Sequence, residues 1–279
     1  MLRIVPASPL LNVRGLLIDL DGVVLTGREA LPGAASFLAE ARRRGLPFLL
    51  VTNNSTTSPT HVAERLRSMG IEAEPREILT SAEVAAAYLR ATDSAGARVL
   101  VIGEDGLREA LVGQGLELVE DETAADWVVA GLDRAFDYRK LKAATRAILG
   151  GASFLATNTD ALLPVEEGEV QPGAGSIVAA ISAATGAEPV VAGKPEPALF
   201  RRGLERLGNL APSEAAMIGD RLDTDVDGGR RAGLRTILVL TGVSNADDVA
   251  NAPHPPDAVV PSLAAVGPLL GWEEGDSVG

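Results

Sequence analysis

Residues 15–24 read GLLIDLDGVV and place two acidic residues at the end of an apolar run. The run over residues 15–20 is short and continuous, which predicts a buried strand. Asp19 and Asp21 come where this strand meets a turn at Gly22. Ligands of open parallel sheets bind at the carboxyl ends of strands, so the two acids are candidate functional residues. An ordinary Asp-Gly turn is the alternative for this segment taken alone.

The rest of the chain alternates short β-like runs with helical patterns, which is typical of an α/β protein with parallel sheets. Further strands are predicted over residues 47–52, 98–102, 116–119, 127–130, 153–156, 190–192, 215–218, 236–240 and 258–260. Helices are predicted over residues 34–44, 60–69, 107–114, 137–149, 176–185 and 197–207. The pattern therefore predicts an α/β fold class.

Three more predicted strands are followed by polar residues. TNNS at residues 52–55 supplies short hydroxyl and amide groups suited to an anionic oxygen. GKP at residues 193–195 sets a lysine ahead of a helix, and GDRLDTD at residues 219–225 carries three acids. Each has an ordinary alternative: helix-capping residues, a surface lysine, and the acidic start of a helix. Asp223 fits that last alternative.

The combination of these segments points to phosphate chemistry. Asp19, Asp21, Asp220 and Asp225 would repel one another if the fold gathered them at one sheet edge. Lys194 alone cannot neutralise four carboxylates, so a divalent cation is implied. Oxygen ligands suit Mg²⁺. Phosphoryl transfer needs a nucleophile, charge neutralisation and donors to the phosphoryl oxygens, and these segments offer all three.

Composition excludes several other functions. The chain has 279 residues, enough for one large α/β domain or two ordinary domains, and 46% of them are hydrophobic. With 25 basic and 38 acidic residues, the net charge is −13, so binding of nucleic acid or an anionic membrane through net charge is not expected. Cysteine is absent, which rules out disulfides and thiolate chemistry. His61 and His254 lie far apart in sequence, which disfavours a Ser-His-Asp triad or a two-histidine metal site.

The sequence shows no clear targeting signal. Pro6 and Pro9 interrupt any apolar core near the first residue, so no secretory signal peptide is expected. No stretch reaches about 18 uninterrupted apolar residues, so no membrane span is expected. A cytoplasmic protein fits these features best, and the lack of cysteine is compatible with that location.

The motifs, in this order, resemble those of the haloacid dehalogenase (HAD) superfamily. DLDGVV at residues 19–24, the strand end at Thr52, Lys194 and GDRLDTD match its four motifs. A long α/β segment separates the second motif from the third, as in the p-nitrophenylphosphatase or NagD-like branch. The strings TNNS, ATNTD, PGAGS and GKP are also similar to that branch. The resemblance covers nearly the whole chain.

The resemblance implies two domains. Residues 1–81 and 190–279 would form a Rossmann-like catalytic core with a doubly wound parallel sheet. Residues 82–189 would form an inserted, smaller α/β cap domain that sets substrate specificity.

The resemblance also implies the catalytic roles. Asp19 would be the nucleophile that forms an aspartyl-phosphate, and Asp21 would protonate the leaving alcohol and then activate water. Asp19, the backbone carbonyl of Asp21 and Asp220 would hold Mg²⁺. Asp225 would stand behind these ligands and orient water or Lys194. An acid at the Asp21 position favours a phosphatase over a dehalogenase.

The remaining implied roles concern the substrate. Thr52, Asn53 and Lys194 would bind the phosphoryl oxygens, with Asn54 close by. Leu163 would stand where a relative selective for pyridoxal phosphate carries a histidine, and a leucine cannot donate a hydrogen bond there. Asp133 and Asp160 are further substrate-binding candidates in the cap, although each is equally a turn or capping residue.

The expected function is Mg²⁺-dependent hydrolysis of small phosphomonoesters, of the sugar phosphate, glycerol phosphate or p-nitrophenyl phosphate type. One alternative is a phosphotransferase or mutase of the same superfamily, which would pass phosphate to an acceptor other than water. Another is a catalytically retired protein that binds a phosphorylated metabolite. A small phosphorylated metabolite is the expected partner, and by resemblance a homodimer would form through the cap.

Overall fold

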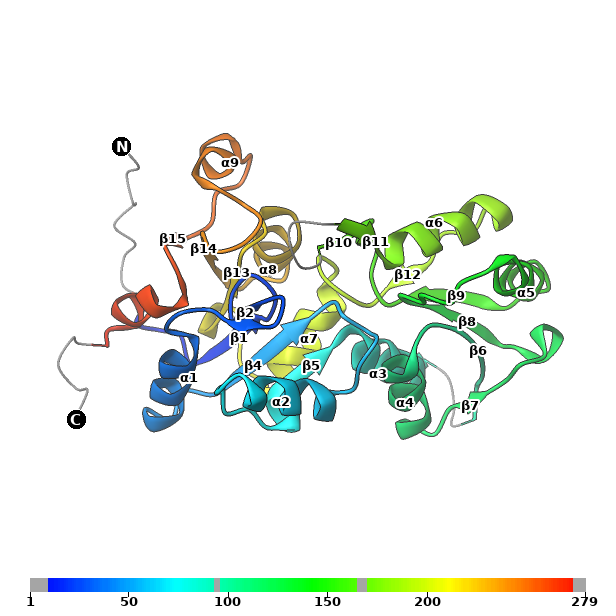
Figure 1. The fold of residues 1–279 in the computed structure, drawn as a ribbon, viewed down its shortest axis with the longest axis horizontal. Coiled ribbons are helices and arrows are strands. Elements are labelled where there is room, and N and C mark those ends of the chain that lie inside the picture. The colour runs from blue at the N-terminus through cyan, green and yellow to red at the C-terminus, as the bar shows by residue number, and fades with distance from the viewer. Residues whose placement is uncertain (1–9, 93–95, 165–169, 273–279) are drawn as a thin grey trace. The chain divides into compact units, whose positions relative to one another are not determined.

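The computed structural model describes residues 10–92, 96–164 and 170–272 (Figure 1). The chain divides into two compact units. As far as they are described, Met1–Val51, Ala63–Ile78 and Phe200–Gly279 form the first unit, and Thr52–Val62 and Leu79–Leu199 form the second. The expected division into a core and a cap at residues 82 and 189 stays a prediction.

A six-stranded sheet has the order β15-β14-β13-β1-β4-β5. Its members are β1 (Gly15–Asp19), β4 (Phe48–Thr52), β5 (Ile78–Thr80), β13 (Ala215–Gly219), β14 (Arg235–Val239) and β15 (Ala258–Val260). β1 pairs in parallel with β4 and β13, and β14 pairs in parallel with β13 and β15. The chain runs from β1 outward to β5 and later returns on the other side through β13, so the strand order reverses between β1 and β13. Such a reversal is where doubly wound sheets bind ligands.

The central strands of this sheet are buried along their whole length. Leu16, Leu17 and Ile18 of β1 have no exposed surface, and every residue of β4 and β13 is buried. Strands covered on both faces lack the alternation of polar and apolar residues seen in half-exposed strands. The continuous apolar run at residues 15–18 therefore reflects a strand in the middle of a parallel sheet.

A five-stranded sheet in the second unit has the order β12-β9-β8-β6-β7, and all its pairings are parallel. Its members are β6 (Arg98–Ile102), β7 (Glu117–Leu118), β8 (Trp127–Ala130), β9 (Ser153–Ala156) and β12 (Val190–Val191). Two antiparallel hairpins complete the described strands: β2 (Leu25–Thr26) with β3 (Glu29–Ala30), and β10 (Leu162–Pro164) with β11 (Val170–Pro172).

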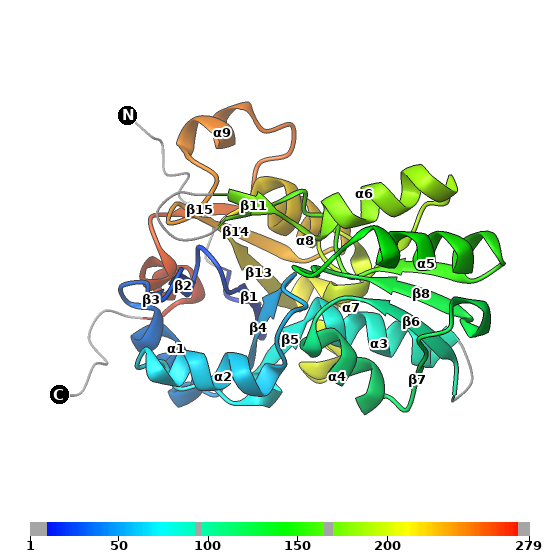
Figure 2. The same ribbon diagram turned by 45° about the vertical axis from the view of Figure 1, so that its right-hand side comes forward.

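The described helices are α1 (Ala34–Arg43), α2 (Pro59–Ser68), α3 (Ser81–Thr92), α4 (Asp105–Gly113), α5 (Tyr138–Leu149), α6 (Ala174–Thr185), α7 (Pro197–Arg206), α8 (Asp227–Arg231) and α9 (Ala246–Asn251). In the second unit, α5 and α6 cover one face of the five-stranded sheet, and α3 and α4 lie on the other (Figure 2). Small side chains of α5, such as Ala144 and Ala147, pack with Val128 and Phe154 of the sheet and Ile181 of α6.

The predicted fold class is confirmed: a doubly wound parallel sheet is accompanied by a second α/β domain. The predicted strands and helices are present, with ends shifted by one or two residues. Strand β5, helices α3, α8 and α9 and both hairpins were not among the predicted ranges. Helix α3 is rich in alanine, so its buried face, which includes Val84 and Leu89, differs little in hydrophobicity from its exposed face. The periodic pattern that marks a helix is therefore weak in this segment.

A capping box marks the start of α3. The backbone N–H of Thr80 donates to Glu83 Oε2 at 3.1 Å, and the N–H of Glu83 donates to Thr80 Oγ1 at 3.2 Å. A threonine followed by a glutamate three residues later is a sequence signature of a helix start. That signature would have located α3.

Helix α4 carries two glycines in contrasting surroundings, which allows a matched stability test. A Cβ on Gly106 would lie 2.5 Å from backbone atoms of Thr57, whereas a Cβ on Gly113 meets nothing within 4 Å. We expect Gly106→Ala to destabilise the protein by about 1–3 kcal/mol, because the backbone cannot yield as a flexible side chain would. Gly113→Ala should be neutral or stabilise by about 0.5–1 kcal/mol. Thermal melting of both variants measures the contrast, and equal melting temperatures would contradict it.

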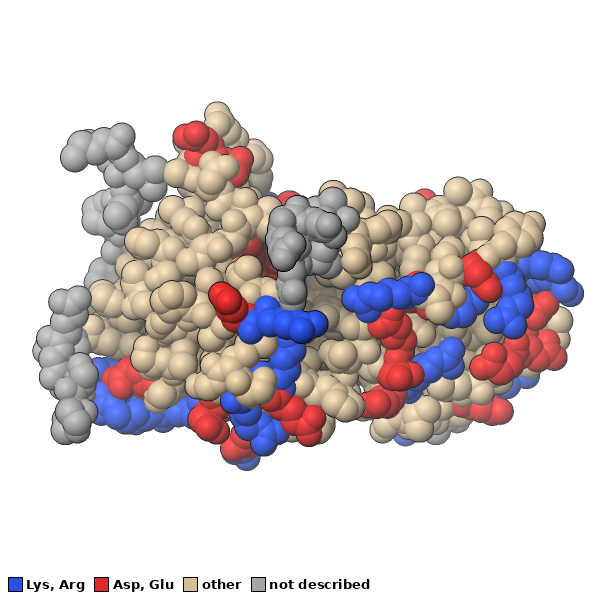
Figure 3. Space-filling model, viewed as in Figure 1, with Lys and Arg blue, Asp and Glu red and all other residues tan. Residues whose placement is uncertain are grey.

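Acidic and basic side chains are interspersed over the described surface of the face in Figure 3. Among the described residues, some ion pairs lie along single helices, as Arg43 does with Glu40 and Arg230 with Asp227. Among the described residues, no helix is both long enough and apolar enough to cross a membrane.

Candidate active site

Three buried carboxylates converge in the first unit. Asp19 is the last residue of β1, Asp220 follows β13 directly, and Asp225 lies in a π-helical turn, Leu222–Val226. One carboxylate oxygen from each residue lies within 4.8 Å of those of the other two. Because β1 and β13 are neighbours at the reversal of strand order, the topology of the sheet brings the first two acids together.

The carboxylate of Asp220 is enclosed by two glycines. A Cβ on Gly22 would lie 2.5 Å from Asp220 Oδ2, and a Cβ on Gly242 would overlap the same oxygen. The φ of Gly22 is 83°, a conformation that favours glycine. The N–H of Val243 donates to Asp220 Oδ2 at 2.7 Å. Glycine at positions 22 and 242 therefore lets the backbone approach the Asp220 carboxylate closely, because a larger side chain at either position would collide with it.

Asp225 and Asp223 lie two residues apart but differ in their surroundings. Asp225 has no exposed surface, and its Oδ2 accepts the N–H of Arg221 at 3.1 Å. Asp223 is exposed, and its carboxylate pairs with the Arg221 guanidinium at 2.7 Å. The hydrogen bond from Arg221 lowers the pKa of Asp223, against the opposing effect of burial. Asp223 is therefore a surface ion-pair partner of Arg221.

These two acids provide a second matched test. Asp225→Ala should lower enzymatic activity at least about tenfold, because it removes a buried carboxylate from the acid cluster. Asp223→Ala removes a surface pair, which typically contributes less than about 1 kcal/mol, and should leave activity near wild type. Phosphate release and thermal melting of the two variants measure the difference. Equal activities would show that Asp225 does not serve the cluster.

The donor set of the cluster fits Mg²⁺. Asp19, Asp220 and Asp225 offer only oxygen atoms, and hard divalent cations prefer oxygen ligands. Ionised carboxylates this close repel one another, and a bound divalent cation replaces that repulsion with attraction. An oxygen of Asp225 lies within the same 4.8 Å limit as oxygens of the other two acids, so Asp225 joins the residues that could hold the ion.

Asp21 occupies a different environment from the three clustered acids. It is exposed and lies in the turn after β1, where the N–H of Gly22 donates to the carbonyl of Leu25 at 2.8 Å. The hydroxyl of Thr241 donates to the carbonyl of Gly22 at 2.6 Å and holds the turn. An exposed carboxylate can exchange protons with a leaving group and with water, as a general acid–base must.

The second group of predicted site residues lies around the end of β4. Asp19 pairs with Val51 in register, and Thr52 follows as the last residue of β4. The buried hydroxyl oxygen of Thr52 accepts the N–H of Asn54 at 3.0 Å. Asn54 Oδ1 in turn accepts the N–H of Thr56 at 2.8 Å, so the side chain of Asn54 shapes the loop.

Lys194 is buried and hydrogen bonded to Asn53. The side chain of Asn53 contacts both the N–H and the carbonyl of Lys194, at 2.8 and 3.0 Å. Asp160 accepts a hydrogen bond from the same side chain at 2.8 Å. The structure therefore brings Asn53, Lys194 and the candidate Asp160 together within the second unit.

Two further predicted residues lie apart from these contacts. Leu163 is half-buried in β10. Asp133 is buried, and its Oδ2 lies 2.6 Å from Lys140 Nζ, while its Oδ1 accepts the N–H of Ala135. These contacts match the alternative in which Asp133 shapes a turn.

Sequence reasoning missed the loop after β14. Ser244 is buried, accepts the N–H of Leu222 at 3.1 Å and donates its own N–H to the carbonyl of Asp220 at 3.0 Å. Together with Gly242 and Val243, it builds the wall around the Asp220 carboxylate. The signal was available, because TGVS at residues 241–244 is another polar strand end like the four that were recognised.

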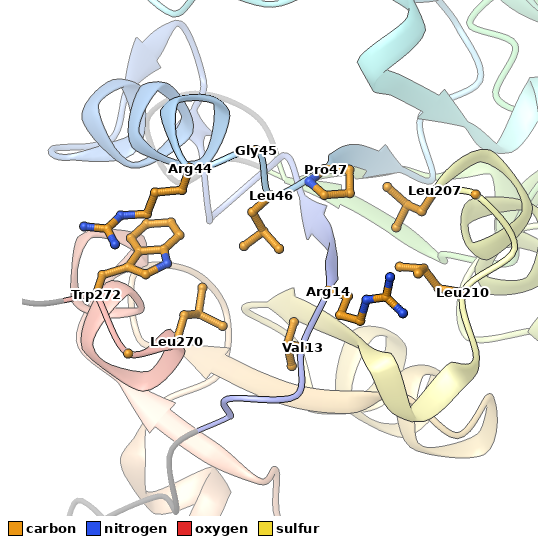
Figure 4. A pocket seen from close by; sticks show the side chains of 12 residues that line it. Val13, Arg14, Arg44, Gly45, Leu46, Pro47, Leu207, Leu210, Leu270 and Trp272 are labelled. Carbon is orange, nitrogen blue, oxygen red and sulfur yellow. The ribbon is translucent and has the colours of Figure 1, made fainter.

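A cavity of about 750 Å³ lies at the opposite ends of the central strands (Figure 4). Val13 and Arg14 precede β1 in its lining, and Leu46 and Pro47 precede β4. The two lining arginines are already paired, Arg14 with Glu214 and Arg44 with Glu40. This cavity is therefore at the amino ends of the strands, away from the acid cluster.

Comparisons with known proteins agree with the fold. A haloacid dehalogenase-like hydrolase model matches residues 16–117, and a HAD-hydrolase-like model matches residues 191–266. An acid sugar phosphatase of Staphylococcus aureus (strain USA300) is 45% identical over 240 residues, which cover 86% of this chain and 91% of the relative. Fold and site define the class: an α/β enzyme with three buried acids gathered at the carboxyl ends of its central strands. The chain belongs to the haloacid dehalogenase-like hydrolase family, which confirms the resemblance.

Solved structures of similar enzymes match nearly the whole chain. A 4-nitrophenylphosphatase from Thermotoga maritima has a TM-score of 0.87 and 34% identity, covering 94% of this chain and 98% of its own. The glycerol phosphate phosphatase Rv1692 from Mycobacterium tuberculosis, in complex with magnesium, has a TM-score of 0.84 and 40% identity, covering 92% of this chain and 77% of its own.

Proposed function

We propose that this protein hydrolyses small phosphomonoesters with the help of Mg²⁺. The observation that carries this proposal is the convergence of Asp19, Asp220 and Asp225 at the reversal of strand order. It is supported by the relatives, which are an acid sugar phosphatase, a 4-nitrophenylphosphatase and a magnesium-bound glycerol phosphate phosphatase. Sugar phosphates and glycerol phosphate are the first substrates to test.

In this proposal, Asp19 and Asp21 carry the chemistry. A carboxylate oxygen of Asp19 forms a bond to phosphorus while the bond from phosphorus to the ester oxygen breaks, and Asp21 gives its proton to the departing alkoxide. Asp21 then takes a proton from water, whose oxygen attacks phosphorus, and Asp19 leaves as a free carboxylate with release of inorganic phosphate. Mg²⁺ would be held by Asp19, Asp220 and the backbone carbonyl of Asp21, with Asp225 beside them, and it supplies neutralisation of phosphoryl charge.

The other predicted residues serve binding. Thr52, the backbone N–H of Asn53 and Lys194 bind the phosphoryl oxygens, and the side chain of Asn54 shapes the loop that follows β4. Residues 82–189 act as the specificity-determining cap, in which Leu163 offers the substrate an apolar contact. Two copies of the protein form a homodimer through their caps. Tyr138 on α5 is 81% exposed and is a suitable contact residue for that dimer. A cytoplasmic location remains part of the proposal.

Phosphate release from a panel of phosphomonoesters, with Mg²⁺ and with EDTA, tests the function. Metal-dependent release is expected, with the ranking of esters indicating the natural substrate class. Transfer of phosphate to added alcohols or sugars in preference to water would favour the phosphotransferase alternative. Folded protein that binds esters but releases nothing would favour the retired binding protein.

A further inference from the structure

The Asn53 side chain holds the backbone of Lys194 at two points. The N–H of Lys194 donates to Asn53 Oδ1 at 2.8 Å, and Asn53 Nδ2 donates to the carbonyl of Lys194 at 3.0 Å. The orientation of the carboxamide follows from its partners, because an N–H only donates and a carbonyl only accepts. Lys194 is 4% exposed, so water competes little for these bonds. One amide therefore determines where the Lys194 backbone lies.

Asp160 selects this orientation of Asn53. Asn53 Nδ2 donates its second hydrogen to Asp160 Oδ2 at 2.8 Å. Hydrogen bonds to ionised groups are stronger than neutral ones, so the carboxylate favours the rotamer with Nδ2 toward Asp160 and Oδ1 toward the Lys194 N–H. A flipped carboxamide would set its oxygen against the Asp160 carboxylate and the Lys194 carbonyl.

The position of Asp160 is itself determined by hydrogen bonds. The N–H of Asp160 donates to Asn158 Oδ1 at 3.1 Å, and Asn158 Nδ2 donates to the carbonyl of Asn53 at 2.8 Å. The hydroxyl of Ser81, at the start of α3, donates to the same carbonyl at 2.6 Å. The backbone and the side chain of Asn53 are thus both tied to the segment that carries Asp160.

Close backbone packing supports these bonds. A Cβ on Gly193 would lie 2.5 Å from Asn53 Oδ1 and 2.5 Å from the carbonyl oxygen of Thr157. Only glycine at this position lets the residue before Lys194 approach both neighbours. The loop after β4, the segment after β9 and the residues after β12 therefore form one hydrogen-bonded assembly in the second unit.

We propose that Asp160 is a positioning residue for Lys194 and acts through the Asn53 carboxamide. The inference rests on the proposed function, in which Lys194 binds the phosphoryl oxygens. Asp160 contacts Asn53, and Asn53 contacts the backbone of Lys194. Substitution of Asp160 therefore removes none of the phosphoryl-binding groups but lets Lys194 move from its position. The kcat for ester hydrolysis should fall more than KM rises, because a displaced lysine loses contacts that are made best in the transition state. The Mg²⁺ dependence should stay that of the wild type.

Three variants and one control test this inference with p-nitrophenyl phosphate. Asp160→Ala should lower kcat about 10- to 100-fold, the range for groups that orient another functional residue. Asp160→Asn keeps an oxygen acceptor for Asn53 Nδ2 and should stay within about threefold of wild type. Asn53→Asp keeps the shape of the side chain but places a carboxylate oxygen against two acceptors, Asp160 Oδ2 and the carbonyl of Lys194. Its kcat should fall at least as far as that of Asp160→Ala. Asp121→Ala removes a capping carboxylate of the same unit and should keep the wild-type kcat.

A double-mutant cycle tests whether Asp160 acts through Asn53. The loss in Asp160→Ala/Asn53→Ala should be close to that in Asn53→Ala alone, since coupled residues are not additive. The inference would be overturned if the losses in kcat of the two single variants were additive in the double variant. It would also be overturned if Asp160→Ala kept the wild-type kcat, or if Asp160→Asn lost as much kcat as Asp160→Ala. If melting shows that Asn53→Ala does not fold, the contrast between the two Asp160 variants decides. A wild type that hydrolyses no ester would overturn the proposed function, and this inference with it.

Discussion

Asp19→Asn is expected to abolish phosphate release, with a loss on the order of 10⁴-fold or more. The carboxamide has the shape of the carboxylate but is a poor nucleophile, so no covalent intermediate forms. Asp19 is buried at the end of β1, and the substitution adds no volume there. Phosphate release from p-nitrophenyl phosphate at saturating Mg²⁺ measures the effect.

Two observations would strengthen this result. Acid-quenched wild type should carry a phosphoryl adduct, detectable by intact mass, and Asp19→Asn should not. Asp223→Asn changes an exposed carboxylate near the cluster in the same way and should keep its activity. An Asp19→Asn variant with a tenth of the wild-type rate would show that another group is the nucleophile.

Asp220→Asn is expected to raise the Mg²⁺ concentration required for half-maximal activity by at least about 10- to 100-fold. The asparagine oxygen can still accept the N–H of Val243, which donates at 2.7 Å in the wild type, so the loop stays in place. The lost negative charge weakens cation binding specifically. Titration of phosphate release with Mg²⁺ measures the shift.

Excess metal separates this effect from that of Asp19. High Mg²⁺ should restore part of the activity of Asp220→Asn and none of Asp19→Asn. EDTA should remove the activity of the wild type, and added Mg²⁺ should restore it. Unchanged activity in EDTA would contradict the role of the acid cluster as a metal site.

Much of the fold was predictable because its central strands have no polar face. The runs that became β1, β8, β9 and β15 were located within a residue, since strands buried on both faces are continuous apolar segments. The two-residue strands of the β2–β3 hairpin have no such run. Helix α3 was missed because its alanines carry little hydrophobic contrast, although Thr80 and Glu83 marked its start.

The candidate residues were also predictable, but their functions within the site were not all visible. Asp225 was expected to stand behind the metal ligands, but one of its carboxylate oxygens lies within 4.8 Å of oxygens of both Asp19 and Asp220, close enough to hold the ion with them. Asn53 was expected only to bind the substrate, and its side chain proves to bind the backbone of Lys194. A sequence shows which groups are present but not which partner each one selects.

The sequence by itself determined the residue types, their order and the strand ends that carry them, because short apolar runs and the turns after them are local properties of a chain. It thereby indicated the family and the chemistry. Only the tertiary structure decided which strand ends are neighbours, since β1 meets β13 through pairings about 200 residues apart in sequence. It also decided that Asp160 faces Asn53, 107 residues away, because hydrogen bonds between distant segments depend on packing that no local pattern encodes.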